Sequence, residues 1–327
     1  MTISSATDEG RQEMSTKKRM VLIAAGAVVI ATFVAAVAMS AFGPSFDDPD
    51  DARCNAPGVT FGDLATSSDH REVSVNFTCE GAVQAGTLYL PAGTGQHPAV
   101  IWVHGAGEAA RLPYGAPIVS GLVDEGVAFF AFDKRGVGES QGECCPGDYG
   151  HFNLLTADVV GAIEAVRSAT GIDPDRVGLI GASQAGWVAP RAAVNSHHVA
   201  FMALASAGIL PYDEVKAYAE LTGGDGSDTP LPSSQEIAEA LQNAPRSGMD
   251  PHLFLQRMDI PTLWLLGDTD KEVPFKQSVA LLDDLKREGE DFTVKPFPGA
   301  GHGLLDVPPT DPDALPTLIR WVVDVAQ

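Results

Sequence analysis

The amino-acid sequence predicts an α/β protein in which helices cover both faces of a mostly parallel sheet. Continuous apolar runs such as AVIWV and VAFFAF are typical of strands buried on both sides. Between these runs lie segments such as LLTADVVGAIEAV, whose apolar residues recur three and four positions apart, as in amphipathic helices. Strands that alternate with helices form parallel sheets. With 327 residues, 45% of them hydrophobic, the chain can build one large core.

The expected elements follow one another regularly along the chain. Two segments with strand-like alternation come first, at 72–79 and 85–91, joined by a turn at 80–84. Apolar strands follow at 99–105, 127–133, 176–183, 200–208 and 261–268, and a last strand at 291–299. Helices are expected at 154–169, 184–194, 278–289 and 314–326.

One region interrupts this alternation. Between residues 206 and 261 the sequence shows no strand pattern, only the helix-like segments PYDEVKAYAEL and QEIAEALQNA around a loop rich in Gly, Asp, Pro and Ser. We predict a small helical lid at about 207–260, inserted above the sheet, where it would help to shape a substrate pocket.

The N-terminus predicts a membrane segment. Residues 20–42 form an uncharged run that reaches roughly 35 Å at ~1.5 Å per residue, enough to cross a hydrocarbon core of ~30 Å. The basic cluster KKR precedes the run and acidic residues follow it, so the N-terminus is expected in the cytoplasm. Cleavage near AMSA, which would release a secreted protein, is the alternative. The predicted parts are a cytoplasmic tail at 1–19, an anchor at 20–42, a linker at 43–66 and an extracytoplasmic domain at 67–327.

Charge and cysteine content narrow the function. A formal net charge of −22 argues against nucleic acid as a partner, because phosphates are bound by Lys and Arg. Outside the cytoplasm disulfides are permitted, so Cys54 in the linker could be joined to Cys79 on an early strand. The adjacent Cys144 and Cys145 could form a disulfide with each other or remain thiols. No H-E-x-x-H or C-x-x-C pattern occurs, so neither a metal nor a cofactor is expected.

The stretch GLIGASQAGW indicates a nucleophile. Ser183 lies where an apolar strand meets a helix, as in a nucleophile elbow. Such a turn needs small residues two positions before and two after the serine, and Gly181 meets the first demand. Ala185 stands where glycine is usual, and the glycine follows one position later, at Gly186. A serine that merely caps the helix N-terminus is the structural alternative.

A serine nucleophile needs a base and a carboxylate that orients the base. His302 lies in the glycine-rich segment GAGHG after the last strand, and Asp270 follows the preceding strand in LLGDTD. We therefore predict Ser183, Asp270 and His302 as the catalytic residues, in the chain order expected for this chemistry. Asp268 is the rival carboxylate, although we expect it to support the turn.

The reaction also needs donors for a developing oxyanion. We predict the backbone N–H groups of Gln184, directly after the nucleophile, and of Ala106, in the loop after the 99–105 strand. His104 begins this loop, and we expect it to hold the loop by hydrogen bonding.

Together, the segments VHGAG, FDKRGVGES, IDPDRVGLIGASQAG, LLGDTDKEVP and GAGHG resemble bacterial serine hydrolases of the α/β-hydrolase superfamily, in particular esterase, thioesterase and acyl-peptidase-like members. The resemblance covers roughly residues 70–327. It implies an α/β-hydrolase fold and cleavage of small acyl esters through an acyl-enzyme, with thioesters and then peptides as alternative substrates. It also implies that the segment from Asp133 to Ser140, including Arg135, braces the floor of the site. Ala185 and the paired cysteines depart from the family pattern.

Two functions of other classes compete with this interpretation. Gly105, Gly107 and Ala110 match the dinucleotide-binding pattern G-x-G-x-x-A, and Asp133 ends the next strand, roughly where a ribose-binding acid would stand. That hypothesis, an oxidoreductase, leaves Ser183 and His302 unexplained. The other is a non-catalytic extracytoplasmic binding protein on a hydrolase scaffold.

Overall fold

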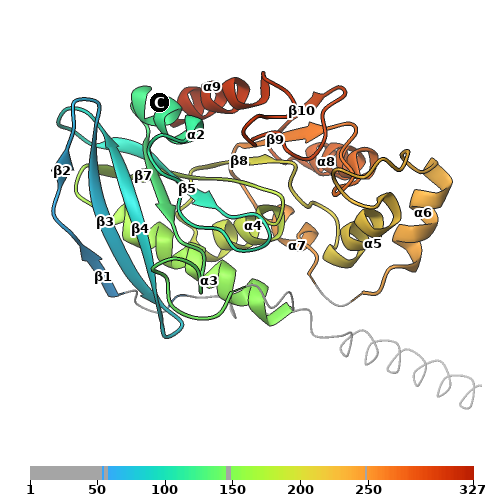
Figure 1. Cartoon of the computed structure of the whole chain (residues 1–327), viewed down its shortest axis with the longest axis horizontal. Coiled ribbons are helices and arrows are strands. Elements are labelled where there is room, and N and C mark those ends of the chain that lie inside the picture. Colours follow the sequence, from blue (N-terminus) through green and yellow to red (C-terminus); the bar gives the residue numbers. More distant parts are fainter. Residues whose placement is uncertain (1–53, 55–57, 145–148, 247–248) are drawn as a thin grey trace, which may run out of the picture. The chain divides into compact units, whose positions relative to one another are not determined.

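The computed structural model describes residues 54, 58–144, 149–246 and 249–327. Within these residues, helices flank a ten-stranded sheet (Figure 1). The strands are β1 (Gly58–Phe61), β2 (Ala65–Thr66), β3 (His70–Cys79), β4 (Ala82–Pro91), β5 (His97–Val103), β6 (Ala128–Phe132), β7 (Ile172–Ala182), β8 (Phe201–Ala205), β9 (Thr262–Gly267) and β10 (Phe292–Phe297). The helices are α2 (Pro117–Asp124), α3 (Tyr149–Arg167), α4 (Ala185–Ser196), α5 (Tyr212–Thr222), α6 (Ser234–Asn243), α7 (His252–Leu255), α8 (Phe275–Glu288) and α9 (Ala314–Ala326).

The strand order confirms a mostly parallel sheet. It runs β1-β3-β4-β6-β5-β7-β8-β9-β10, and β2 pairs with β3 beside this path. All neighbours from β6 to β10 are parallel, whereas β1, β3 and β4 form an antiparallel edge. Because parallel strands end at the same edge of a sheet, the loops after β5, β7, β9 and β10 gather there.

Both faces of the sheet are covered. One core packs the sheet against α3, α4 and α8, for example through Ile163 and Leu282. The second core packs the opposite face against α2 and α9, for example through Leu122 and Leu318, and Figure 1 shows these two helices together on one side of the sheet. Each fully buried side chain of this kind contributes about 1.5–3 kcal/mol relative to an exposed one. Burial on both faces explains why the central strands are apolar throughout.

The structure differs from the expected elements near the N-terminal edge. The turn between β3 and β4 contains only Glu80 and Gly81, with φ of 47° and 73°, because two residues with positive φ suit the twist of a tight hairpin. Strand β4 therefore begins at Ala82, inside the predicted turn at 80–84, whereas β3 ends at Cys79 as predicted. Strands β1 and β2 lie in the range 43–66 that was predicted as a linker; they pair with β3 and are largely exposed, so they lack an alternating pattern. Helix α2 was not predicted.

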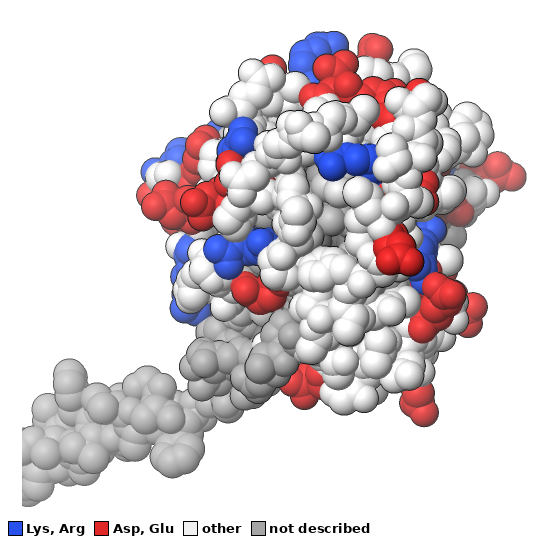
Figure 2. Space-filling model, turned by 90° about the vertical axis from the view of Figure 1, so that its left-hand side faces the viewer, with Lys and Arg blue, Asp and Glu red and all other residues white. Residues whose placement is uncertain are grey.

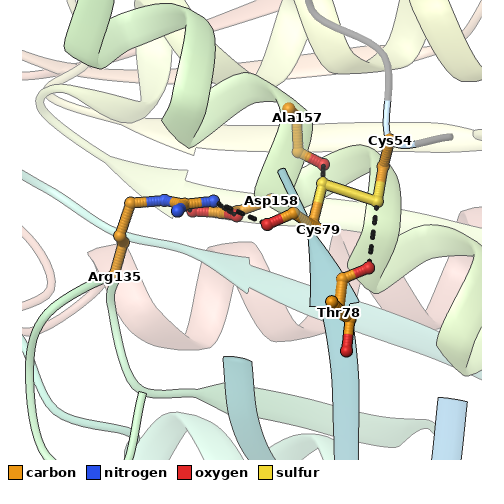
Figure 3. The surroundings of a disulfide bond; sticks show 6 residues. All are labelled: Cys54, Thr78, Cys79, Arg135, Ala157 and Asp158. Atoms are coloured by element: carbon orange, nitrogen blue, oxygen red, sulfur yellow. Dashed lines mark hydrogen bonds and ion pairs between the residues drawn. A yellow bond between two sulfur atoms is a disulfide. The ribbon is translucent and has the colours of Figure 1, made fainter. Parts of the chain in front are cut away.

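A disulfide between Cys54 and Cys79 fastens the chain before β1 to the end of β3, as the sequence suggested. Figure 3 shows its surroundings. The sulfur of Cys79 lies 3.1 Å from the carbonyl oxygen of Ala157 in α3. The carbonyl of Cys79 accepts a hydrogen bond of 3.1 Å from Arg135, which also forms a buried ion pair with Asp158 of α3. The disulfide, α3 and the loop after β6 are therefore joined in one buried cluster. Cys145 lies outside the described residues, so its pairing with Cys144 stays a prediction.

The predicted tail at 1–19 and anchor at 20–42 also lie outside the described residues. In the described part of the chain, no helix is long and apolar enough to cross a membrane. The face shown in Figure 2 carries acidic side chains close to basic ones and shows no continuous basic surface, which agrees with the net charge of −22.

Candidate active site

Ser183 lies at the turn between β7 and α4 in a left-handed backbone conformation, with φ of 56°. This conformation is uncommon for a residue with a side chain and is held by its surroundings. Its N–H donates to the carbonyl of Ala205, and its own carbonyl accepts from the N–H groups of Gly186 and Gly208, at 3.0–3.1 Å. The N-cap of α4 is Gln184, so Ser183 is not the cap of the helix. The turn has the form of a nucleophile elbow.

The small residues around the elbow have distinct steric reasons. A Cβ on Gly181 would lie 2.5 Å from the carbonyl oxygen of Val103 and 2.7 Å from the Cβ of Ala185, so glycine is required there. The methyl group of Ala185 is fully buried and is accommodated because Gly181 has no side chain. A Cβ on Gly186 would lie 2.1 Å from the carbonyl oxygen of Gly208. Glycine is therefore needed at 186, one position later than in the usual motif.

His302 and Asp270 are joined by a hydrogen bond of 2.9 Å between Nδ1 and Oδ2. Because a carboxylate only accepts, Nδ1 carries the proton, and Nε2 is left with its lone pair as the basic nitrogen. The other oxygen of Asp270 accepts two backbone N–H groups, from Glu272 and Val273, each at 2.8 Å. Asp270 is only 2% exposed. The carboxylate is thus fixed on one side by the backbone and holds the imidazole on the other.

The surroundings of His302 shift its pKa in opposing directions. Burial lowers the pKa, whereas the hydrogen bond and charge of Asp270 raise it, with further raising by the charges of Asp225 and Glu272. The net result is a pKa above the ordinary value of 6.5. As the pH falls through this raised pKa, protonation removes the basic form of His302.

Asp268, the rival carboxylate, has another role. Its Oδ1 accepts a hydrogen bond of 2.6 Å from the N–H of Gly299 and so joins the end of β9 to the turn after β10. This is the turn-supporting role that the sequence suggested.

A cavity of about 850 Å³ connects the predicted residues. Ser183, His302 and Ala106 all line it, and the carboxylate-bearing residues Asp225 and Glu272 lie on it as well. Among the described residues, no hydrogen bond joins the hydroxyl of Ser183 to His302, and such bonds often tighten only when substrate binds. The rest of the lining is mainly apolar, with Trp102, Leu112, Ile118, Leu305, Val307 and Leu315 among its members.

Among the described residues, the two N–H groups predicted as oxyanion donors have no hydrogen-bond acceptor. The backbone N–H of Gln184 follows Ser183 directly, and that of Ala106 belongs to the loop after β5. In the described part of the chain, neither N–H donates to a protein acceptor. Both donors are therefore available to a group bound in the cavity.

The segment from Asp133 to Ser140 is held by hydrogen bonds within itself and to Arg111 in the loop after β5. Asp133 accepts hydrogen bonds from the backbone and guanidinium of Arg111 and from the N–H of Glu139. The Ser140 hydroxyl donates to the carbonyl of Asp133 at 2.7 Å. Arg135 is 4% exposed and paired with Asp158, so it faces the interior and not the cavity.

These contacts also exclude the dinucleotide-binding interpretation. Both oxygens of Asp133 are occupied by protein donors. The glycines after β5 lead into a loop, and α2 begins only at Pro117, whereas a pyrophosphate site needs a helix N-terminus at that point.

His104 holds the loop after β5, as expected. Its Nε2 donates to the carbonyl of Phe132 at 2.7 Å. Burial and the positive charge of Lys134 lower the pKa of His104 to about 4, so the ring is neutral at neutral pH.

The inserted helices reach the site through the loop that carries Asp270. The hydroxyl of Tyr218 in α5 donates to the carbonyl of Asp270 at 2.7 Å, and Thr222 donates to the carbonyl of Lys271. The N–H of Asp225 donates to the Glu272 carboxylate at 3.0 Å. Sequence reasoning placed a lid here but missed these anchoring contacts, because no local pattern links residues 218 and 270.

The family model that matches the sequence describes the prolyl oligopeptidase family and covers residues 118–327. Among curated proteins, Dipeptidyl-peptidase 5 of Porphyromonas gingivalis is 26% identical over 192 residues, which are 56% of this chain and 27% of that protein. The human acylamino-acid-releasing enzyme is 26% identical over 242 residues, 69% of this chain and 31% of that protein. The chain thus spans about a third or less of the length of these relatives.

Solved structures share the fold. Acetyl xylan esterase 1 from Thermoanaerobacterium sp. JW/SL YS485 superposes with a TM-score of 0.65 over 87% of this chain and 94% of that one, at 19% identity. An acetyl xylan esterase from Paenibacillus sp. R4 gives a TM-score of 0.61 over 82% and 89%, at 16% identity. These similarities establish the α/β-hydrolase fold.

Proposed function

Because the chain belongs to the prolyl oligopeptidase family and has an α/β-hydrolase fold, we propose that it is a serine hydrolase that cleaves carboxylic esters through an acyl-enzyme on Ser183. The observation that carries the proposal is the hydrogen bond between His302 and Asp270 on the cavity that Ser183 also lines. These residues lie 87 and 32 positions apart in the sequence, yet the fold brings all three to one edge of the sheet.

In the proposed mechanism, Nε2 of His302 takes the proton of Ser183 as Oγ attacks the acyl carbon. The resulting oxyanion accepts hydrogen bonds from the N–H groups of Ala106 and Gln184. His302 then gives its proton to the departing alcohol, and the acyl group stays on Ser183. Water, deprotonated by the same nitrogen, attacks the acyl-enzyme and releases the acid. Asp270 accepts the hydrogen bond from Nδ1 throughout and stabilises the imidazolium.

The cavity supports an uncharged acyl ester as substrate. Its apolar walls suit an aliphatic or aromatic group, which gains about 25 cal/mol for each Å² of apolar surface that it buries. Asp225, Glu272 and Asp306 also line the cavity, and their negative charges disfavour an anionic substrate. Asp225 comes from the insertion at about 207–260, which we propose acts as the lid.

Peptides are the second candidate substrate class. The prolyl oligopeptidase family and the relatives named Dipeptidyl-peptidase 5 and acylamino-acid-releasing enzyme support it. Amide cleavage needs the same residues, but the amine is a poorer leaving group than an alcohol and depends more on receiving a proton as it departs. A panel of p-nitrophenyl esters, thioesters and aminoacyl anilides separates the classes by relative kcat/KM.

A fluorophosphonate probe tests the assignment directly. Such a probe should label the folded wild-type protein on Ser183, and Ser183→Ala should abolish labelling without changing the circular dichroism spectrum. A folded protein that neither labels nor hydrolyses any ester in the panel would instead support a non-catalytic binding protein.

We further propose that residues 20–42 anchor the chain in the cell membrane, with 1–19 in the cytoplasm and the hydrolase domain, which includes β1 and β2 from the predicted linker, outside. The apolar run and its flanking charges support this topology. An epitope tag at the N-terminus should stay with the membrane fraction after alkaline extraction, while added protease should reach the hydrolase domain in spheroplasts. Recovery of a tag-free soluble form would indicate cleavage and secretion.

A further inference from the structure

Lys134 is a buried cation behind the cavity that the proposed mechanism does not use. It follows β6, is 1% exposed, and directs its ammonium group at three uncharged oxygens. These are the carbonyls of Gly105 and Gly107, at 2.8 and 3.0 Å, and Oε1 of Gln184, at 2.8 Å. The three protons of the ammonium are thus all used. In the described part of the chain, Lys134 forms no ion pair.

The oxygens that Lys134 binds belong to the two segments that carry the predicted oxyanion donors. The carbonyl of Gly105 and the N–H of Ala106 are parts of one peptide group, and in a planar trans peptide they point in opposite directions. A carbonyl held toward Lys134 therefore turns the N–H of Ala106 away from it. Since Ala106 lines the cavity with Ser183, that N–H is free to face the substrate.

The hydrogen bond to Gln184 links this loop to the elbow. Gln184 provides the second N–H, and its side-chain oxygen is bound by the same ammonium group that binds the loop after β5. A flexible loop could rotate its peptide groups, but one cation that holds both segments limits this rotation. In addition, a positive charge on the carbonyl side of a peptide polarises its N–H as a donor, an effect that is stronger in a dry interior than in water.

We propose that Lys134 is a positioning residue of the oxyanion site: it fixes the peptide between Gly105 and Ala106 with its N–H toward the cavity and ties it to Gln184. The proposal rests on the proposed function, because it assigns a role in stabilising the oxyanion formed on attack by Ser183. It differs from a purely structural role, since the effect falls on the transition state and not on substrate binding or folding.

The main test compares Lys134→Met with wild type and with Lys286→Met, a change at an exposed lysine on α8. Lys134→Met keeps an unbranched side chain as far as the ε position but removes the ammonium group, with its charge and its three donors. We expect kcat for a p-nitrophenyl ester to fall by about 10²-fold, the loss typical of an oxyanion donor, while KM stays within about threefold. Affinity for a trifluoromethyl ketone, which forms a tetrahedral adduct, should fall in proportion to kcat. Lys286→Met should behave as wild type.

The pH profile gives a readout that a structural role would not change. Burial lowers the pKa of Lys134 to about 8, so the ammonium is present at neutral pH and is lost as the pH rises through that value. Wild-type kcat/KM should therefore decline above about pH 8. The Lys134→Met variant has no ammonium group to lose, so its kcat/KM should not decline above this pH. It should still lose activity at low pH, where His302 is protonated.

A milder variant covers the case in which Lys134→Met does not fold. Gln184→Ala keeps the ammonium group of Lys134 and the backbone N–H of residue 184. It removes the side-chain oxygen through which Lys134 links the two segments, and we expect kcat to fall by about tenfold at unchanged KM. If the wild type is active and Lys134→Met has the kcat of wild type, the inference is wrong while the proposed function stands. The same holds if Lys134→Met differs from wild type only in KM or thermal stability. Gln184→Ala at wild-type kcat would also overturn the inference. A wild type without ester or amide turnover would overturn the proposed function, and the inference with it.

Discussion

The backbone of Gly208, after β8, occupies the place where a side chain on Gly186 would lie. A Cβ at 186 would be 2.1 Å from the carbonyl oxygen of Gly208 and 2.6 Å from its nitrogen. The N–H of Gly208 also donates to the carbonyl of Ser183 at 3.1 Å. The segment after β8 thus packs directly onto the elbow and helps to hold its strained conformation.

Gly186→Ala should consequently disturb the elbow. The added methyl group meets backbone atoms that cannot rotate away, so we expect a loss of about 1–3 kcal/mol in the free energy of unfolding, together with a marked fall in kcat. Chemical denaturation and ester turnover measure the two effects. Ala185→Gly, which restores the usual motif at the neighbouring position, is the matched control and should retain most of the activity. Equal behaviour of the two variants would contradict this account.

Asp225→Asn should move the acidic limb of the pH profile to lower pH. The charge of Asp225 is one of those that raise the pKa of His302, and in the proposed mechanism the active form of His302 is neutral. Activity is lost as the pH falls through this pKa, so removing the charge lowers the pKa and extends activity to more acidic conditions. Asp228→Asn in the same loop, whose charge is not among those that shift His302, is the control. The difference between the variants should shrink at high salt.

Tyr218→Phe tests whether the inserted helices position Asp270. The change removes the hydrogen bond to the carbonyl of Asp270 and should lower the free energy of unfolding by about 0.5–1.5 kcal/mol. We expect kcat to fall more than KM rises, because the loop that orients His302 loosens. Tyr212→Phe on the same helix, whose hydroxyl has no hydrogen-bond partner among the described residues, should leave kcat unchanged. Identical kinetics in both variants would exclude this positioning role.

Replacing Cys54 and Cys79 by serine should destabilise the domain. The disulfide joins two cysteines with a sequence separation of 25 and closes a loop that includes β1, β2 and β3, and opening such a loop typically costs about 2–4 kcal/mol. Urea denaturation of the double variant beside the wild type, both without reductant, measures the difference. An unchanged midpoint would show that the disulfide does not stabilise the domain.

Local sequence patterns predicted most of the fold. The apolar runs that form β5 to β9 are buried on both faces of the sheet. Their continuous apolar pattern therefore identifies them as strands without knowledge of what they pair with. The exposed edge strands β1 and β2 were missed because their side chains bury little surface, and only pairing with β3 defines them.

The sequence predicted those residues of the candidate site whose type is required by the proposed chemistry. A serine at a strand-to-helix turn, a histidine between glycines and an aspartate after a strand each carry a local signal. Lys134 has no such local signal, because a lysine in the charged segment DKRG is typical of the protein surface. Its burial and its three carbonyl and amide partners come from segments 27–50 positions away.

By itself, the sequence determined the alternation of strands and helices, the elbow at Ser183 and the two side chains that could serve it, because these depend on residue type and local spacing. Only the tertiary structure decided that Asp270, and not Asp268, faces His302, that glycine is needed at 186, and that a buried ammonium lies behind the two N–H groups predicted as oxyanion donors. Each of these depends on the approach of backbone segments that are distant in the chain, and that approach is set by packing across the sheet.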